Sequence, residues 1–169
     1  MAGADSSRTQ VQKTELKGVT RLTEPSTKVV EQSVRISASP ETVWRYWTDP
    51  QRMCKWWGAA AELDPQPGGI CRVEMGSGPV MRGEYLEVVP YERLVFSFGW
   101  EPTEHGPDIA PGSSRVEVLL VADAGDTIMT LRHSGIPNAY AELHQSGWSQ
   151  FLPMLADAAS SETSKEVNR

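Results

Sequence analysis

Apolar and polar residues alternate with a period of two in a series of short segments between residues 30 and 133. In the first segment Val30, Val34 and Ile36 share one parity, while Glu31 and Arg35 take the other. Such alternation is typical of a β-strand that buries one face. Strands are therefore predicted over residues 30–36, 60–63, 70–75, 81–89, 94–100, 115–121 and 127–133, separated by turn-forming residues.

The hydrophobic period becomes helical near the C-terminus, where apolar residues recur at i, i+3, i+4 and i+7. These residues are Trp148, Phe151, Leu152 and Leu155. They predict an amphipathic helix from about residue 138 or 141 to 158, with His144 one turn before Trp148 on the same side. Pro153 would lie inside this helix and cost about 3 kcal/mol unless a kink relieves it, or unless two helical pieces meet there.

Two short helices are predicted after the first strand. Ser39 has the character of an N-cap and Pro40 takes the first helical position. Asp49 and Pro50 repeat this signal and open a second helix through Met53. Strands followed by a long terminal helix indicate an α+β fold.

The alternation also predicts which strand residues face the helix. The inward set is Cys71, Val73, Met75, Leu94, Phe96, Phe98, Trp100, Val116, Val118, Leu120, Met129, Leu131 and His133. The segment 81–89 is ambiguous, because Glu84 and Glu87 have opposite parity; a bulge would reconcile them, with Tyr85 inside.

Four arginines of the strands are expected on the outer face, among interleaved glutamates. They are Arg72, Arg82, Arg115 and Arg132. If any of these arginines pointed inward instead, it would anchor a ligand carboxylate or phenolate. Arg82 is the first candidate for such an exception, because the register of its strand is the least certain.

Length and composition indicate one domain over residues 29–158, with flexible tails at 1–28 and 159–169. The net charge is −6 and a basic footprint is lacking, so nucleic acid is not an expected partner. No apolar run is long enough to span a membrane and no signal-peptide core is present, which predicts a cytoplasmic protein. Cys54 and Cys71 fit free thiols in a reducing compartment, and a single disulfide between them is the alternative.

Catalytic and metal-binding patterns are weak. Two of the three histidines, His133 and His144, are expected to converge near one end of the sheet, where proton transfer is conceivable, but buried structural histidines are commoner. The spacing of the histidines and cysteines matches no metal site, and no cofactor motif is found.

Several segments together resemble the START-like (SRPBCC) superfamily, in particular the bacterial family named after the C-terminal domain of the activator of the heat-shock protein 90 ATPase. They are Ser39–Trp44, Trp47–Pro50, Trp56–Gly58, Pro67–Gly69, Gly83–Pro90, Leu94–Phe96 and Gly147–Trp148. The resemblance covers about residues 29–158. It implies a helix-grip fold, in which a curved antiparallel sheet of about six to seven strands wraps around a long C-terminal helix and leaves an internal cavity.

Members of this superfamily mostly bind hydrophobic small molecules, and some are cyclases or hydrolases. The resemblance therefore predicts a carrier, sensor or sequestering protein for a small hydrophobic or aromatic ligand, with no cofactor or metal. The alternative is an enzyme that uses His133, His144 or Tyr85 in the same cavity, and a chaperone-binding module is a weaker alternative. For the oligomeric state, the sequence allows a homodimer as well as a monomer. The expected ligand-binding residues are Trp56, Trp57, Val73, Met75, Tyr85, Phe96, Phe98, Trp100, Val118, Met129, Leu131, His133, His144, Trp148, Phe151 and Leu152.

Overall fold

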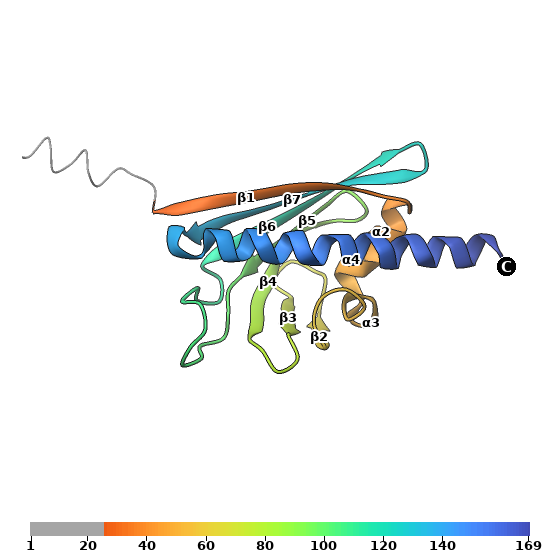
Figure 1. Ribbon diagram of the computed structural model, residues 1–169. Helices are drawn as coiled ribbons and strands as arrows, with labels where there is room; N and C mark the ends of the chain where they lie inside the picture. The colour runs from red at the N-terminus through yellow and green to blue at the C-terminus, as the bar shows by residue number, and fades with distance from the viewer. Residues whose placement is uncertain (1–25) are drawn as a thin grey trace, which may run out of the picture.

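Seven antiparallel strands form one sheet in the computed structural model of the protein, which describes residues 26–169 (Figure 1). The strands are β1 (Thr27–Ile36), β2 (Ala60–Leu63), β3 (Ile70–Glu74), β4 (Val80–Val89), β5 (Arg93–Phe98), β6 (Ser114–Asp123) and β7 (Asp126–Pro137). The helices are α2 (Pro40–Thr48), α3 (Pro50–Met53) and α4 (Ala141–Val167), the last preceded by a 3-10 turn, η1 (Asn138–Tyr140). These elements confirm the predicted α+β class, with two short helices after the first strand and a long C-terminal helix.

The strand order is β1-β7-β6-β5-β4-β3-β2, so the first strand pairs with the last. β6 and β7 form a hairpin whose two loop residues, Ala124 and Gly125, have positive φ angles of 51° and 87°. That conformation matches the right-handed twist of the strands. β7 extends to Pro137, four residues beyond its predicted end, because the start of β1 continues to pair with it.

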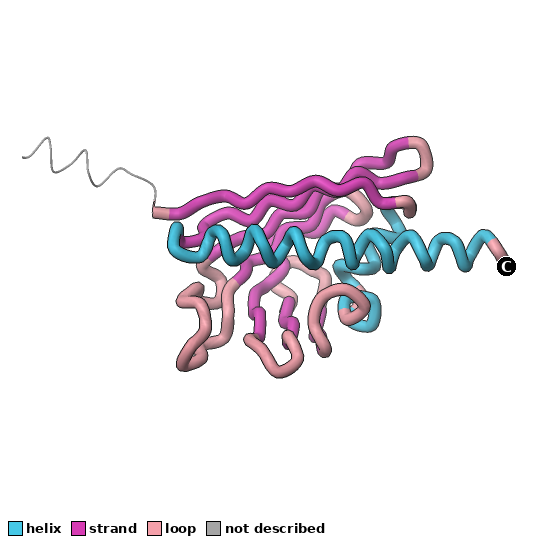
Figure 2. Tube along the Cα trace, in the orientation of Figure 1, coloured by secondary structure: helices cyan, strands magenta, loops and turns pink. Residues whose placement is uncertain are grey.

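The helix α4 lies across one face of the sheet as a single rod (Figures 1 and 2). Its buried residues recur every three or four positions and include Trp148, Leu152, Leu155 and Ala159. Pro153 is exposed, and the helix continues through it, so the structure shows one helix at the place where two helical pieces were a possibility.

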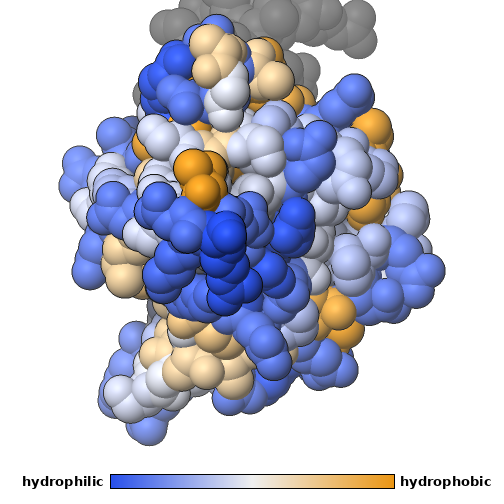
Figure 3. All heavy atoms as spheres, turned by 90° about the vertical axis from the view of Figure 1, so that its right-hand side faces the viewer, coloured by the Kyte–Doolittle hydropathy of each residue, from blue (hydrophilic) through white to orange (hydrophobic). Residues whose placement is uncertain are grey.

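The helix also continues beyond the predicted boundary at residue 158. Residues 159–167 were expected to belong to a flexible tail, and this expectation is wrong, since α4 ends at Val167 and Ala159 is fully buried. Ser, Thr and charged residues make up most of this stretch, so hydrophobic periodicity gives no signal there. Figure 3 views the end of the molecule where α4 finishes and shows a mostly hydrophilic surface with separate hydrophobic patches.

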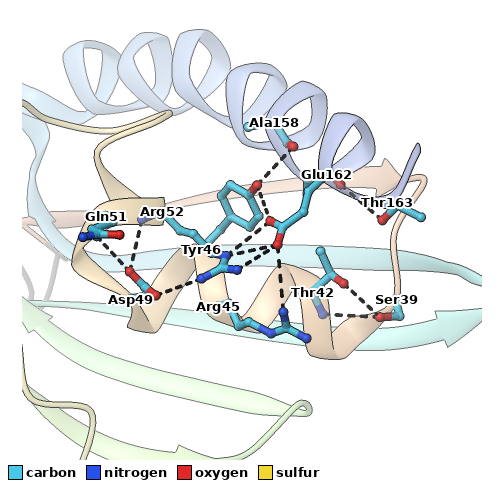
Figure 4. Close-up of polar contacts among 11 residues, drawn as sticks. Ser39, Thr42, Arg45, Tyr46, Asp49, Gln51, Arg52, Ala158, Glu162 and Thr163 are labelled. Atoms are coloured by element: carbon cyan, nitrogen blue, oxygen red, sulfur yellow. Dashed lines mark hydrogen bonds and ion pairs between the residues drawn. The ribbon is translucent and has the colours of Figure 1, made fainter. Parts of the chain in front are cut away.

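A charged cluster holds the last turns of α4 to α2 and α3 (Figure 4). We call it the Glu162 cluster; its members are Arg45, Tyr46, Asp49, Arg52 and Glu162. Arg52 Nη2 lies 2.8 Å from Glu162 Oε1, and the Tyr46 hydroxyl lies 2.6 Å from Glu162 Oε2. These hydrogen bonds lower the pKa of Glu162 to about 2, and the hydrogen bond from Arg52 has the largest effect.

The short helices begin as their sequences predict. Ser39 Oγ accepts from the Thr42 backbone N–H at 3.3 Å, with Pro40 in the first turn of α2. Asp49 Oδ1 accepts from the backbone N–H of Gln51 at 2.9 Å and so caps α3. Each cap satisfies a backbone donor that the helix cannot satisfy itself.

The inward faces of the strands follow the predicted parity, with one correction on the outer face. Val95 is fully buried although its parity points outward, because it is paired with Glu87 and Glu117, which form an ion triad with Arg93. Arg82 lies on the outer face with its side chain 55% exposed, near Glu101, so it is not an inward exception.

The uncertain strand β4 contains the expected irregularity. Its pairing with β5 shifts register between Tyr85 and Glu87, and Tyr85 is fully buried. The Tyr85 hydroxyl donates to the Trp47 carbonyl at 3.1 Å.

The predicted N-terminal tail, residues 1–28, lies mostly outside the described residues. β1 begins at Thr27, so the last two residues of the predicted tail belong to this strand. Within residues 26–169 no helix is both long and apolar enough to cross a bilayer.

Candidate functional site

A pocket of about 310 Å³ lies beside the N-terminal half of α4 and is partly open to solvent. Five of its residues come from α4, and the others come from β5, from the segment that follows α3 and from loops after β3 and β5. The lining residues are Trp57, Met75, Pro79, Phe98, Trp100, Pro107, Leu143, His144, Gly147, Trp148 and Phe151. This volume falls at the lower end of the range of about 300–1,000 Å³ that is usual for small-molecule sites.

Aromatic rings form one continuous wall of the pocket. The rings of Trp57 and Phe98 are nearly parallel, at 6° with centroids 6.3 Å apart, and Trp148 approaches Trp57 at 5.2 Å. Trp100 meets Phe98 edge to face at 5.2 Å and 86°. Such contacts stabilise the rings relative to one another and leave flat apolar surface for a ligand.

His144 is fixed as a neutral imidazole. Trp100 Nε1 donates to His144 Nε2 at 3.0 Å, and an indole nitrogen can only donate, so Nε2 carries no proton. His144 Nδ1 then donates to the Tyr140 carbonyl at 2.8 Å. Burial is the main cause that lowers the pKa of His144. Both ring nitrogens are therefore engaged.

His133 is neutral in the opposite tautomer. Trp148 Nε1 donates to His133 Nδ1 at 3.1 Å, which leaves the proton on Nε2. Nε2 donates to Ser114 Oγ at 2.9 Å, and Ser114 donates in turn to the Phe98 carbonyl at 2.8 Å. Burial, followed by the neighbouring His144, lowers the pKa of His133 to about 3.

The two histidines do lie together, with ring centroids 5.5 Å apart. His144 borders the pocket, whereas His133 is fully buried and holds the indole of Trp148 in place. In this arrangement the pair orients two tryptophans of the wall, and neither imidazole offers a free nitrogen to a bound molecule.

The expected ligand-binding residues divide into two groups. Seven of them line the pocket: Trp57, Met75, Phe98, Trp100, His144, Trp148 and Phe151. The others pack in the core between sheet and helix and do not line it: Trp56, Val73, Tyr85, Phe96, Val118, Met129, Leu131, His133 and Leu152. Strand parity shows which face a residue takes, but it does not show where along the strand the interior is filled.

Four lining residues were missed by the sequence reasoning: Pro79, Pro107, Leu143 and Gly147. A signal existed for the helix residues, because Leu143, Gly147 and Phe151 are spaced four apart and border the buried stripe. Pro107 lies in the loop between β5 and β6. This loop is anchored, since Ile109 is 1% exposed and its carbonyl accepts from the Trp100 backbone N–H at 2.7 Å.

The remaining candidate chemistry lies away from the pocket. Cys54 and Cys71 are both free thiols, and burial raises the pKa of Cys71 to about 12. Within the described part of the chain no cluster of three or more His, Cys, Asp or Glu side chains has metal-binding geometry. His105 lies in an exposed part of the loop between β5 and β6.

An antiparallel sheet that holds a long C-terminal helix defines a helix-grip protein of the START-like class. Residues 37–160 match the family described as activator of Hsp90 ATPase homolog 1-like protein. The chain belongs to this family. None of the curated protein sequences with which it was compared matches it.

Three solved structures show the range of similar proteins. The AHSA1-like protein of Rhizobium etli is 38% identical with a TM-score of 0.64, covering 80% of this chain and 84% of that one. DynU16, a putative protein in the dynemicin biosynthetic locus, is 28% identical with a TM-score of 0.65; the match covers 76% of this chain but only 46% of DynU16. An HSP90 activator from Plasmodium falciparum is 25% identical with a TM-score of 0.59, covering 73% and 90% of the two chains.

Proposed function

We propose that the protein binds a small hydrophobic or aromatic molecule in the pocket beside α4 and acts as a carrier, sensor or sequestering protein. The observation that supports this most directly is the character of the wall, which consists of aromatic, aliphatic and proline residues together with one neutral histidine. Burial of apolar ligand surface supplies about 25 cal/mol per Å² without any reactive group.

The enzyme alternative requires His133, His144 or Tyr85 to move protons. Each of these side chains already makes hydrogen bonds with groups of the protein, and His133 and Tyr85 are fully buried. Burial also raises the pKa of Tyr85 and lowers that of His133, so both charged forms are disfavoured. These contacts favour the binding function over catalysis.

Gly147 offers a direct test of the pocket. It borders the pocket in the middle of α4, and a Cβ placed on it meets no atom within 4 Å. Gly147→Leu should therefore fill pocket volume without a clash, while Gly147→Ala should leave most of the volume open. Both changes replace a helical glycine, which favours the helix by up to about 1 kcal/mol.

The experiment measures naphthalene binding to wild type and to both variants by isothermal titration calorimetry, with denaturant unfolding as the folding control. We expect wild type and Gly147→Ala to bind similarly and Gly147→Leu to bind at least about tenfold more weakly, although both variants remain as stable as wild type. Undiminished binding by Gly147→Leu would contradict the assignment of this pocket. A separate experiment, native mass spectrometry of protein purified from its own host, identifies the natural ligand.

The chaperone-binding alternative is supported by the family's description as Hsp90 ATPase activator homologues and by the similarity to an HSP90 activator from Plasmodium falciparum. A pulldown with the purified chaperone tests it separately. Retention of the chaperone by wild type and Gly147→Leu alike would indicate an interaction that does not use the pocket.

A further inference from the structure

We infer that the pocket selects an uncharged aromatic molecule that presents one hydrogen-bond acceptor to the indole N–H of Trp57. This inference rests on the proposed function, because it specifies the ligand of the same pocket. It follows from an account of every side-chain hydrogen-bonding group in the wall.

The other polar side chains of the wall are already paired inside the protein. The N–H groups of Trp100 and Trp148 donate to His144 and His133, and the second nitrogen of His144 donates to the Tyr140 carbonyl. A ligand therefore finds neither a free acceptor nor a free donor on these side chains. Of the remaining lining residues, only Trp57 has a hydrogen-bonding side chain.

Trp57 differs from its neighbours in the wall. Trp57 as a residue is 3% exposed and its ring stacks on Phe98, yet no side chain or carbonyl within residues 26–169 accepts from its Nε1. Every buried side-chain nitrogen or oxygen in this part of the chain has a hydrogen-bond partner, so Trp57 Nε1 is not one of the buried atoms. The N–H therefore reaches accessible space, and we assign that space to the pocket, because Trp57 is one of its lining residues and is otherwise almost fully buried.

The charge of the wall limits the ligand further. No Asp, Glu, Lys or Arg lines the pocket, and the tautomer of His144 keeps its imidazole neutral. A charged group that entered would lose its hydration without gaining an ion pair. A carbonyl or ether oxygen loses much less and gains the Trp57 N–H, whereas a plain hydrocarbon would cover that donor and leave it without a partner.

Three probes of nearly equal shape separate these contributions: methyl naphthyl ketone, isopropylnaphthalene and naphthoate. Their affinities are measured by calorimetry at pH 7.5 for wild type, Trp57→Phe and the control Trp44→Phe. Trp57→Phe keeps an aromatic ring and removes the donor. Trp44 lies in α2 against Tyr91, outside the pocket lining, so its replacement controls for the loss of an indole elsewhere. Thermal unfolding of each variant shows that it is folded.

For wild type and Trp44→Phe we expect the ketone to bind about three- to tenfold more tightly than the hydrocarbon, and naphthoate to bind most weakly. In Trp57→Phe the preference for the ketone should disappear while hydrocarbon binding changes less than about twofold. A ketone preference that survives in Trp57→Phe, or tightest binding of naphthoate to wild type, would overturn the inference. Failure of all three probes to bind wild type would instead remove the proposed function on which it rests.

Discussion

Glu162 connects the last turns of α4 to the two short helices through a carboxylate whose side chain is only 16% exposed. Arg52 pairs with it and is itself 28% exposed, while Tyr46 reaches it from α2. A partly buried charge of this kind favours folding when its partners are in place, and it costs free energy when one partner is removed. The Glu162 cluster therefore makes the end of α4 part of the folded domain.

Glu162→Gln should lower the free energy of unfolding by about 2 kcal/mol at pH 7, because it removes the charge that Arg52 pairs with. The effect should depend on pH. The unfolded carboxyl takes up a proton near pH 4.5, whereas the folded one keeps its charge down to about pH 2, so the stability that Glu162 supplies is complete above pH 5 and declines as the pH falls from about 4.5 to 2. Urea denaturation at pH 7 and pH 3.5 measures both values.

Glu166→Gln is the matched control, since Glu166 is exposed on the same helix. It should change stability by less than about 0.5 kcal/mol. An equal effect of the two substitutions, or a difference between Glu162→Gln and wild type that grows on acidification, would show that the ion pair does not stabilise the fold.

The sequence predicted the positions of some polar residues better than their interactions. Parity placed His133 inside, and parity together with an assumed bulge placed Tyr85 inside; both are fully buried. Their partners were beyond reach, because Trp148 and Trp47 come from other elements and only the assembled fold brings them close. Glu162 was missed for a different reason: it lies among serines and threonines whose pattern gives no hydrophobic period.

At the scale of elements, α4 contains a proline that its neighbours tolerate. Pro153 is exposed, and its buried neighbours Leu152 and Leu155 keep the apolar stripe on the sheet. The missing amide leaves the Ser149 carbonyl without its helical donor, and Ser149 is exposed, so water can satisfy this carbonyl. The cost of the proline is therefore reduced but not removed.

Pro153→Ala should raise the free energy of unfolding by about 1–2 kcal/mol, because it restores one helical hydrogen bond and relieves the clash with the preceding turn. Thermal and urea unfolding provide the measurement. Pro40→Ala is the control, since Pro40 begins α2, where proline is favourable, and its replacement should stabilise nothing. A loss of stability in Pro153→Ala would mean that the proline maintains a bend that α4 needs.

Element types were more predictable than the pocket they enclose. Strands with one buried face are recognised by the alternation of apolar and polar residues. The capping residues Ser39 and Asp49 predicted where α2 and α3 begin. The pocket depends instead on how far side chains fill the space between sheet and helix. Pro79 and Pro107 reach it from loops, where no periodicity indicates direction.

At the scale of the whole molecule, one helix joins two sites of different chemistry. Gly147 borders the apolar pocket, and Glu162 anchors the opposite end of the helix, about 22 Å away along its axis. No lining residue of the pocket belongs to the Glu162 cluster. Sites that are this far apart and share no partner usually act independently on stability.

We therefore expect ligand binding and the Glu162 cluster to contribute additively. Methyl naphthyl ketone is added at one fixed concentration, about one hundred times its dissociation constant for wild type. It should raise the free energy of unfolding by about 2.7 kcal/mol in wild type and by the same amount in Glu162→Gln. Urea denaturation with and without the ketone gives the four values needed. If the ketone stabilises Glu162→Gln less than wild type, the end of α4 controls the shape of the pocket. Part of the binding free energy would then be used to order a helix that the substitution had loosened.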